Sequence, residues 1–212
     1  MKVLVLGANG GVGKDITAEL VSRGHQVTAA SRTGNSAPTE GVTPVTLDAT
    51  SAAAIAAAAE GHDAIVNAIG PRFGQDDLAI LSNVANALIA GAQESGVTRV
   101  VVVGGSGTLE VAPGVRLVDT DNMPAEYKPL AQAHADAFDV YLGGADGLEW
   151  TYLTPPPEFF PGDRTGTYRA EGDSYLAGPD GRSQLSYADM AVAVVDALEQ
   201  DTNKGARVAV AY

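Results

Sequence analysis

Three glycines near the start of the chain, Gly7, Gly10 and Gly13, have the spacing needed to hold a phosphate-bearing ligand. Such glycines permit a tight turn, let the backbone approach a pyrophosphate, and allow a helix to pack closely on a strand. Residues 3–6 before them form the unbroken apolar run of a buried strand, and residues 15–24 after them have the apolar spacing of a helix. The free amides at the start of such a helix face a bound phosphate. The pattern predicts a dinucleotide site, and a purely structural glycine turn is the alternative.

The end of the second expected strand decides which nicotinamide dinucleotide is favoured. Residues 26–30 predict this strand, and Ser31, Arg32 and Thr33 follow it. A protein that prefers NAD usually has an acidic residue here, which binds the ribose 2′-hydroxyl. This chain has no carboxylate at that point, whereas an arginine can fork onto a 2′-phosphate and a neighbouring hydroxyl can add a hydrogen bond. We therefore expect NADP(H) to be preferred over NAD(H), with a solvated surface arginine as the alternative.

Four stretches of the sequence together resemble one family. The glycines follow the spacing Gly-x-x-Gly-x-x-Gly, within GANGGVGK, and not the Gly-x-Gly-x-x-Gly of the common fingerprint. This loop, the element Asn67–Gly70, the glycines at 104, 105 and 107 and the run Trp150–Pro155 resemble the atypical short-chain dehydrogenase/reductases. That group includes NmrA-like proteins, biliverdin reductase B and the provisionally named NADH-flavin reductases. The resemblance covers essentially the whole chain and implies a Rossmann-type α/β fold with a doubly wound parallel sheet.

The resemblance also implies cofactor contacts beyond the glycine loop. Asp48 and Ala49 would lie beside the adenine, the exit of the fourth strand would follow the adenine-side ribose, and the exit of the sixth would face the nicotinamide. From the residues alone, Asp48 can instead be an N-cap or first-turn acid of the helix expected over 51–61, and both roles can hold together. The complete set of expected cofactor-binding residues is Gly7, Asn9, Gly10, Gly11, Val12, Gly13, Ser31, Arg32, Thr33, Asp48, Ala49, Ala68, Ile69, Gly70 and Pro155. Pro71 and Arg72 extend the same exit.

Ser106 and Tyr127 are the candidate catalytic residues. Ser106 stands where mainstream members of the superfamily place a serine that hydrogen-bonds a substrate carbonyl, although it could instead cap a turn. Those enzymes also carry Tyr-x-x-x-Lys, in which the lysine lowers the tyrosine's pKa. Here Ala131 stands four residues after Tyr127, and Lys128 is adjacent to it, so this dyad is missing. His134, two turns beyond Tyr127, is either a weak substitute or an ordinary surface or core histidine.

The missing dyad bears on the reaction. Reducing a ketone creates an alkoxide and calls for a positioned proton donor. Reducing a flavin or quinone spreads the charge over a delocalised system, so the protein need only align the reactants. We therefore expect an NADPH-dependent oxidoreductase that transfers hydride to a small conjugated acceptor such as a flavin or quinone. An NmrA-like sensor that binds NADP without catalysis is the alternative, and an isomerase or epimerase on the same scaffold is a third interpretation.

Alternating strands and helices must position these residues within one expected domain, residues 1–212. Strands are predicted at residues 3–6, 26–30, 45–47, 63–70, 99–103 and 148–153, with a final edge strand at 208–212. Helices are predicted over residues 15–24, 51–61 and 76–94, from Tyr127 or Pro129 to about Leu142, and from 186 onward. Two segments near 108–126 and 155–185 are expected on the substrate side, the first as a lid or binding loop. The second contains a small hairpin at 163–182 and the aromatics Phe159 and Phe160, which either wall a substrate pocket or pack a lid onto the body.

Composition narrows the class of protein. The chain has 212 residues, of which 18% are charged and 45% hydrophobic, as in an ordinary globular domain. A formal charge of −13 argues against nonspecific nucleic-acid binding. With no cysteine there is no disulfide or thiolate metal site, and we expect no metal. No apolar run reaches membrane-spanning length, and the first strand leaves no room for a leader, so we expect a cytoplasmic protein that acts on a small molecule. Nothing in the sequence specifies an oligomeric state.

Overall fold

A single mixed sheet organises the computed structural model, which describes residues 1–34, 39–71 and 77–212. Its eight strands lie in the order β10-β12-β8-β5-β4-β1-β2-β3. They are β1 (Lys2–Leu6), β2 (Gln26–Ser31), β3 (Val42–Thr46), β4 (Ala64–Asn67), β5 (Arg99–Val103), β8 (Glu149–Thr154), β10 (Arg169–Glu171) and β12 (Ala206–Ala211). All neighbours pair in parallel except β10, which is antiparallel to β12. The doubly wound Rossmann-type fold expected from the sequence is confirmed.

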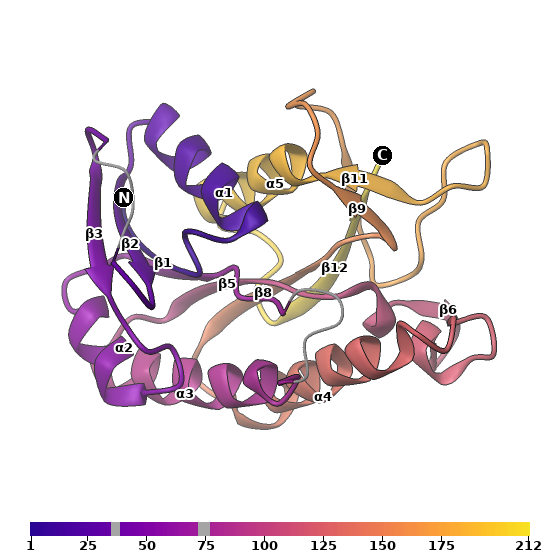
Figure 1. The fold of residues 1–212 in the computed structure, drawn as a ribbon, viewed down its shortest axis with the longest axis horizontal. Coiled ribbons are helices and arrows are strands. Elements are labelled where there is room, and N and C mark those ends of the chain that lie inside the picture. The colour runs from indigo at the N-terminus through magenta and orange to yellow at the C-terminus, as the bar shows by residue number, and fades with distance from the viewer. Residues whose placement is uncertain (35–38, 72–76) are drawn as a thin grey trace.

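Helices cover both faces of the sheet (Figure 1). On one face lie α1 (Gly11–Ser22) and α5 (Tyr187–Glu199), and on the other lie α2 (Ala52–Ala59), α3 (Ile80–Ser95) and α4 (Lys128–Gly144). Successive side chains of a strand point to opposite faces. Val3 and Val5 of β1 therefore join the α1–α5 core, whereas Leu4 and Leu6 join the α2–α4 core. This double burial explains the unbroken apolar run at the start of the sequence.

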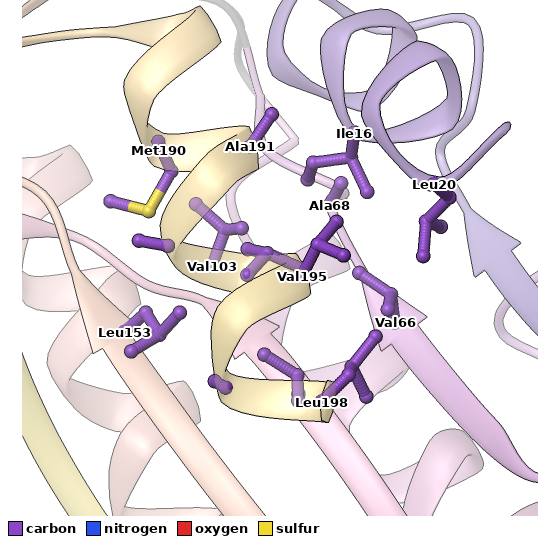
Figure 2. Close-up of a cluster of buried hydrophobic side chains, with 14 of the residues drawn as sticks. Ile16, Leu20, Val66, Ala68, Val103, Leu153, Met190, Ala191, Val195 and Leu198 are labelled. Carbon is purple, nitrogen blue, oxygen red and sulfur yellow. The ribbon is translucent and has the colours of Figure 1, made fainter. Parts of the chain in front are cut away.

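The core between α1, α5 and the sheet holds α1 in place. Figure 2 shows Ile16 of α1, Val195 of α5 and Val66 of β4 gathered in one cluster, and all three side chains are buried. Burying an aliphatic side chain of this size stabilises the fold by about 1.5–3 kcal/mol. The packing holds α1 and α5 side by side over the strands that carry the glycine loop (residues 7–13).

The edges of the sheet differ from the prediction. The last strand, β12, is not an edge strand, because β10 pairs with its outer side. This pairing also replaces the hairpin expected within residues 163–182. At the other edge, β3 begins at Val42 and includes Pro44, both of which precede the strand predicted at 45–47. An edge strand tolerates proline because one side of its backbone needs no partner. Helix α3 begins at Ile80, and residue 76, its expected start, lies outside the described residues.

Two segments that lie outside the main sheet, except for β10 in the second, contact each other. The first holds η1 (Ser106–Thr108), β6 (Glu110–Ala112), β7 (Val115–Arg116) and η2 (Leu117–Asp119), and the second holds β9 (Glu158–Phe160) and β11 (Gln184–Ser186). The Glu110 amide donates to the Asp173 carbonyl over 3.0 Å, and the Tyr175 amide donates to the Glu110 carbonyl over 2.8 Å. The Arg207 guanidinium of β12 donates to the Thr108 carbonyl and to the Asp173 carboxylate. Arg207 thus ties both segments to the sheet.

Glu19 of α1 anchors the second segment through a buried carboxylate. Arg164 donates to it twice, each time over 2.8 Å, and Arg23 donates to it over 2.8 Å. The hydrogen bonds from Arg164, more than any other contact, hold the pKa of Glu19 below its usual value. A carboxyl group with a lowered folded-state pKa contributes stability above its unfolded pKa and loses it as the pH falls through the folded value.

We therefore expect Glu19→Gln to lower the free energy of unfolding by about 1–2 kcal/mol at pH 7, because the amide loses the negative charge and one of the two acceptor oxygens that face Arg164 and Arg23. The difference from wild type should shrink as the pH falls below about 4.5, the usual range for a glutamate. Urea unfolding of both proteins across this range measures it, with Glu94→Gln, exposed on α3, as the control. A difference that stays constant with pH would contradict the assignment.

Candidate functional site

The glycine loop lies between the exits of two strands. The amides of Gly7 and Ala8 donate to the Ala30 carbonyl at the end of β2, over 3.1 and 3.2 Å. Gly7 has a φ of +79°, which favours glycine, and a Cβ on it would lie 3.0 Å from the Ala68 carbonyl oxygen beyond β4. Strand order reverses between β1 and β4, and this is where open α/β sheets bind their ligands. The loop therefore stands at the ligand-binding position of the fold.

The start of α1 leaves its first amides open. Gly10 is the N-cap residue and has no side chain, so the amides of Gly11, Val12 and Gly13 have no side-chain acceptor there. Gly10 and Gly11 are both exposed. A Cβ on Gly13 would lie 2.1 Å from the Gly7 carbonyl oxygen, so only glycine allows the helix to sit this close to the loop. Free amides at the positive end of a helix suit a phosphate.

The end of β2 presents an arginine and a hydroxyl beside this loop. Asn9 Nδ2 and the Gly34 amide each donate to Ser31 Oγ over 3.0 Å. Because that oxygen already accepts two bonds, its own proton remains available to a ligand. Arg32 and Thr33 are exposed, and Arg32 makes no hydrogen bond or ion pair with the residues that the structure describes. The structure thus brings Asn9 and Ser31 together and leaves Arg32 open to an anion.

Asp48 does not cap α2, contrary to one interpretation of the sequence. The N-cap is Ser51, whose hydroxyl accepts from the Ala54 amide, and the first turn of α2 holds no acidic residue. Asp48 instead accepts from the Thr50 amide over 2.9 Å and from the Thr50 hydroxyl over 2.7 Å, and these bonds hold its pKa below the usual value. Its carboxylate is exposed at the end of β3, with Ala49 partly buried behind it. Contact with adenine stays a prediction.

The exit of β4 is fixed by Asn67. Its buried side chain accepts from the Ile69 amide over 3.1 Å, and the Ala68 amide donates to the Leu6 carbonyl of β1 over 3.0 Å. Ala68 and Ile69 are thereby held against Gly7, and Gly70 beyond them is exposed. Pro155 lies buried at the exit of β8, separated from β4 by β5. Arg72, expected at the same exit as Gly70, lies outside the described ranges.

The candidate catalytic residues follow β5 and begin α4. Ser106 starts η1, and its hydroxyl makes no hydrogen bond with any described residue, so it does not cap this turn. Tyr127 is the N-cap residue of α4 and is 47% exposed. His134 packs against Gly105, since a Cβ there would lie 2.5 Å from the His134 ring. Burial lowers the pKa of His134 to about 4, so this imidazole is neutral at pH 7 and is not a cationic proton donor.

An aromatic residue that the sequence did not single out also contacts the glycine loop. A Cβ on Gly11 would lie 2.8 Å from Cε2 of Tyr187, the first residue of α5. Sequence reasoning placed Tyr187 only in the first turn of a helix, because its contact with Gly11 depends on how α1 and α5 pack.

Comparison with known proteins agrees with this geometry. The family model described as NAD(P)H-binding matches residues 7–201. A protein from Burkholderia pseudomallei, provisionally named an exported protein, is 42% identical with a TM-score of 0.91, and all of both chains is covered. A provisionally named epimerase from Bacteroides thetaiotaomicron is 30% identical, with a TM-score of 0.89 and coverage of 100% of this chain and 96% of that one. A provisionally named NADH-flavin reductase from Streptococcus pneumoniae is 34% identical, with a TM-score of 0.87 and coverage of 100% and 99%.

The cytoplasmic location expected from the sequence stays a prediction, and one of these similar proteins is named as exported. None of the helices within the described ranges combines the length and the apolar character needed to cross a bilayer. The match over residues 7–201 includes both the glycine loop and the strands that surround it. On that match, and on the uncapped glycine loop at the reversal of strand order, the chain belongs to the NAD(P)H-binding family.

Proposed function

We propose that this protein is an NADPH-dependent oxidoreductase that reduces a small conjugated acceptor such as a flavin or a quinone. The proposal rests on the open amides at the start of α1, which lie beside an exposed Arg32 with no partner among the described residues. When bound, the reduced nicotinamide supplies a hydride. The protein's own residues hold the dinucleotide, select its 2′-phosphate and exclude competing acceptors.

The residues at the loop fit such a dinucleotide. Gly10 and Gly11 place no side chain between the pyrophosphate and the helix amides. We expect a Cβ on Gly10, which would lie 3.1 Å from the Gly7 carbonyl oxygen, to narrow that access. Arg32 would pair with the 2′-phosphate while the Ser31 hydroxyl donates to it. On this proposal the remaining contacts come from the residues that follow the other strands, namely Asp48, Ala49, Ala68, Ile69, Gly70 and Pro155.

The acceptor class is inferred from the groups around Ser106. Ala131 stands where mainstream enzymes have a lysine, and its methyl group packs against Gly107, since a Cβ on that glycine would lie 2.7 Å from the Ala131 Cβ. His134 is neutral at pH 7. A delocalised acceptor needs alignment more than a strong acid. The name of the similar Streptococcus pneumoniae protein supports a flavin, although it specifies NADH, and Arg32 is our reason for NADPH.

The two segments outside the sheet would form the acceptor side of the site. They are joined by the backbone bonds of Glu110 and are fastened to β12 by Arg207. In the second segment, Phe159 is partly buried and Phe160 is exposed. We propose that these residues border the acceptor.

We expect purified protein with NADPH to reduce FMN, FAD or a simple quinone slowly but measurably, followed as loss of the reduced-nicotinamide absorbance. Tyr127→Phe should change this rate by far less than the roughly 10²–10⁴-fold expected from loss of a general acid, because no strong acid is needed. A larger loss would make Tyr127 a proton donor and indicate a carbonyl substrate. If the protein binds NADPH tightly but reduces no acceptor, the interpretation as a nucleotide sensor replaces that of an enzyme.

A further inference from the structure

The first residues of two helices meet at the glycine loop. Helix α1 begins at Gly11 and α5 at Tyr187, and the two helices pack side by side (Figure 1). Helix α1 leads into β2 and α5 leads into β12, and both strands run parallel to their neighbours. Both helices therefore begin near the carboxyl ends of the parallel strands. The fold therefore places Tyr187 at the same end of the strands as the free amides of α1.

The Tyr187 ring lies directly against the loop. From a Cβ on Gly11, the nearest atoms would be Cε2, Cδ2 and Cζ of Tyr187, at 2.8, 3.3 and 3.7 Å. Cζ carries the phenol oxygen, so the hydroxyl is one bond beyond a carbon that already reaches the start of α1. The side chain is partly buried, yet its hydroxyl makes no hydrogen bond with any described residue. This hydroxyl is not among the enclosed side-chain atoms without a partner in the described residues, so it is accessible to a ligand.

Neighbouring residues hold Tyr187 in this position. The Phe159 ring packs edge-on against it, with centroids 4.5 Å apart and planes at 64°. Phe159 is itself fixed by the pairing of β9 with β11, which runs straight into α5. Two residues further on, buried Asp189 accepts from Thr165 Oγ1, the Gly166 amide and Tyr212 Oη, each over 2.7 Å. The first turn of α5 is thus restrained before any ligand binds.

We propose that the Tyr187 hydroxyl donates a hydrogen bond to the pyrophosphate of the bound dinucleotide, while its ring closes the open side of the glycine loop. This inference rests on the proposed cofactor site. The pyrophosphate is the part of the ligand that meets the start of α1, whereas the 2′-phosphate lies at Arg32, beyond β2. Since both dinucleotides contain the pyrophosphate, Tyr187 contributes to binding either of them.

The test compares the dissociation constants of NADPH and NADH for wild type and Tyr187→Phe, measured by fluorescence titration without an acceptor. The substitution keeps the ring against Phe159, so the fold is retained. We expect both affinities to fall by a similar factor of about 10, as for the loss of one hydrogen bond to a charged group. Tyr168→Phe is the matched control: its hydroxyl bonds Asp196, which also pairs with Arg23 at the far end of α1.

Unchanged affinity for both dinucleotides in Tyr187→Phe overturns the inference. A loss confined to NADPH also overturns it, because it places the hydroxyl at the 2′-phosphate. Wild-type protein that binds a dinucleotide but reduces no acceptor contradicts the proposed reaction and leaves the Tyr187 result intact. Wild-type protein that binds neither dinucleotide overturns both.

Discussion

Gly10→Ala is expected to weaken NADPH and NADH binding by at least about 100-fold, roughly 2.7 kcal/mol, while the chain stays folded. Gly10 has a φ of −71°, which alanine adopts freely, and its Cβ would lie 3.1 Å from the Gly7 carbonyl oxygen. A shift of a few tenths of an ångström relieves that contact. The methyl group would occupy the space through which the pyrophosphate approaches the helix amides, so the cost falls on the ligand and not on the fold.

Two other substitutions make this result specific. Gly143→Ala adds a methyl group at an exposed position of α4 with nothing within 4 Å, and binding should not change. Gly13→Ala would place a Cβ 2.1 Å from the Gly7 carbonyl oxygen and should disturb the loop itself. Circular dichroism and thermal unfolding report the fold, and fluorescence titration reports the affinity. Wild-type affinity in Gly10→Ala would remove the main support for the cofactor site.

Arg32→Ala is expected to weaken NADPH binding by about 1.5–3 kcal/mol, a factor of roughly 10 to 150, and to leave NADH binding nearly unchanged. The Arg32 side chain is exposed at the end of β2 and has no partner among the described residues, so its removal disturbs no internal ion pair. The lost group is the forked donor to the 2′-phosphate, which NADH lacks. Titration of both dinucleotides into both proteins gives the ratio directly.

The salt dependence and a charge-matched control complete this test. Because the expected pair is exposed, NADPH affinity of the wild type should fall with added salt more steeply than that of Arg32→Ala. Lys204→Ala removes one positive charge that pairs with Glu149 and Asp201, beyond the opposite ends of the strands, and should not alter the NADPH-to-NADH ratio. A wild type that prefers NADH, or a preference for NADPH that survives Arg32→Ala, would show that the assignment is wrong.

The parts of the site fixed by local geometry could be predicted from the sequence. Gly7 adopts a positive φ that favours glycine, and Gly13 lies so close to the Gly7 carbonyl that a side chain would clash. Both positions therefore require glycine, and the sequence shows these glycines at a fixed spacing. The same holds for the buried runs of β1 and β5, whose burial on both faces leaves unbroken apolar stretches. These patterns located the loop and the Rossmann-type order of elements.

The parts fixed by distant contacts could not be predicted. Strands β9, β10 and β11 have three residues each, too few to show a period, and their pairing is set by the surrounding fold. For this reason β12 was wrongly expected at the edge. The N-cap residue of α2 is Ser51 and not Asp48, and helix propensity cannot resolve a difference of three residues at a helix end. Tyr187 carries no motif at all, since its position follows from the packing of α5 on α1.

The two ends of the sheet also bear on how copies of this protein behave when they are crowded together. An exposed sheet edge is a template on which another chain can add a strand and start aggregation. Here one edge strand, β3, contains Pro44, which has no backbone N–H to donate. The other, β10, is only three residues long and is antiparallel to β12. Neither edge offers a long row of free backbone groups. The sheet is therefore protected against edge-to-edge growth by a proline-containing strand at one end and a very short antiparallel strand at the other.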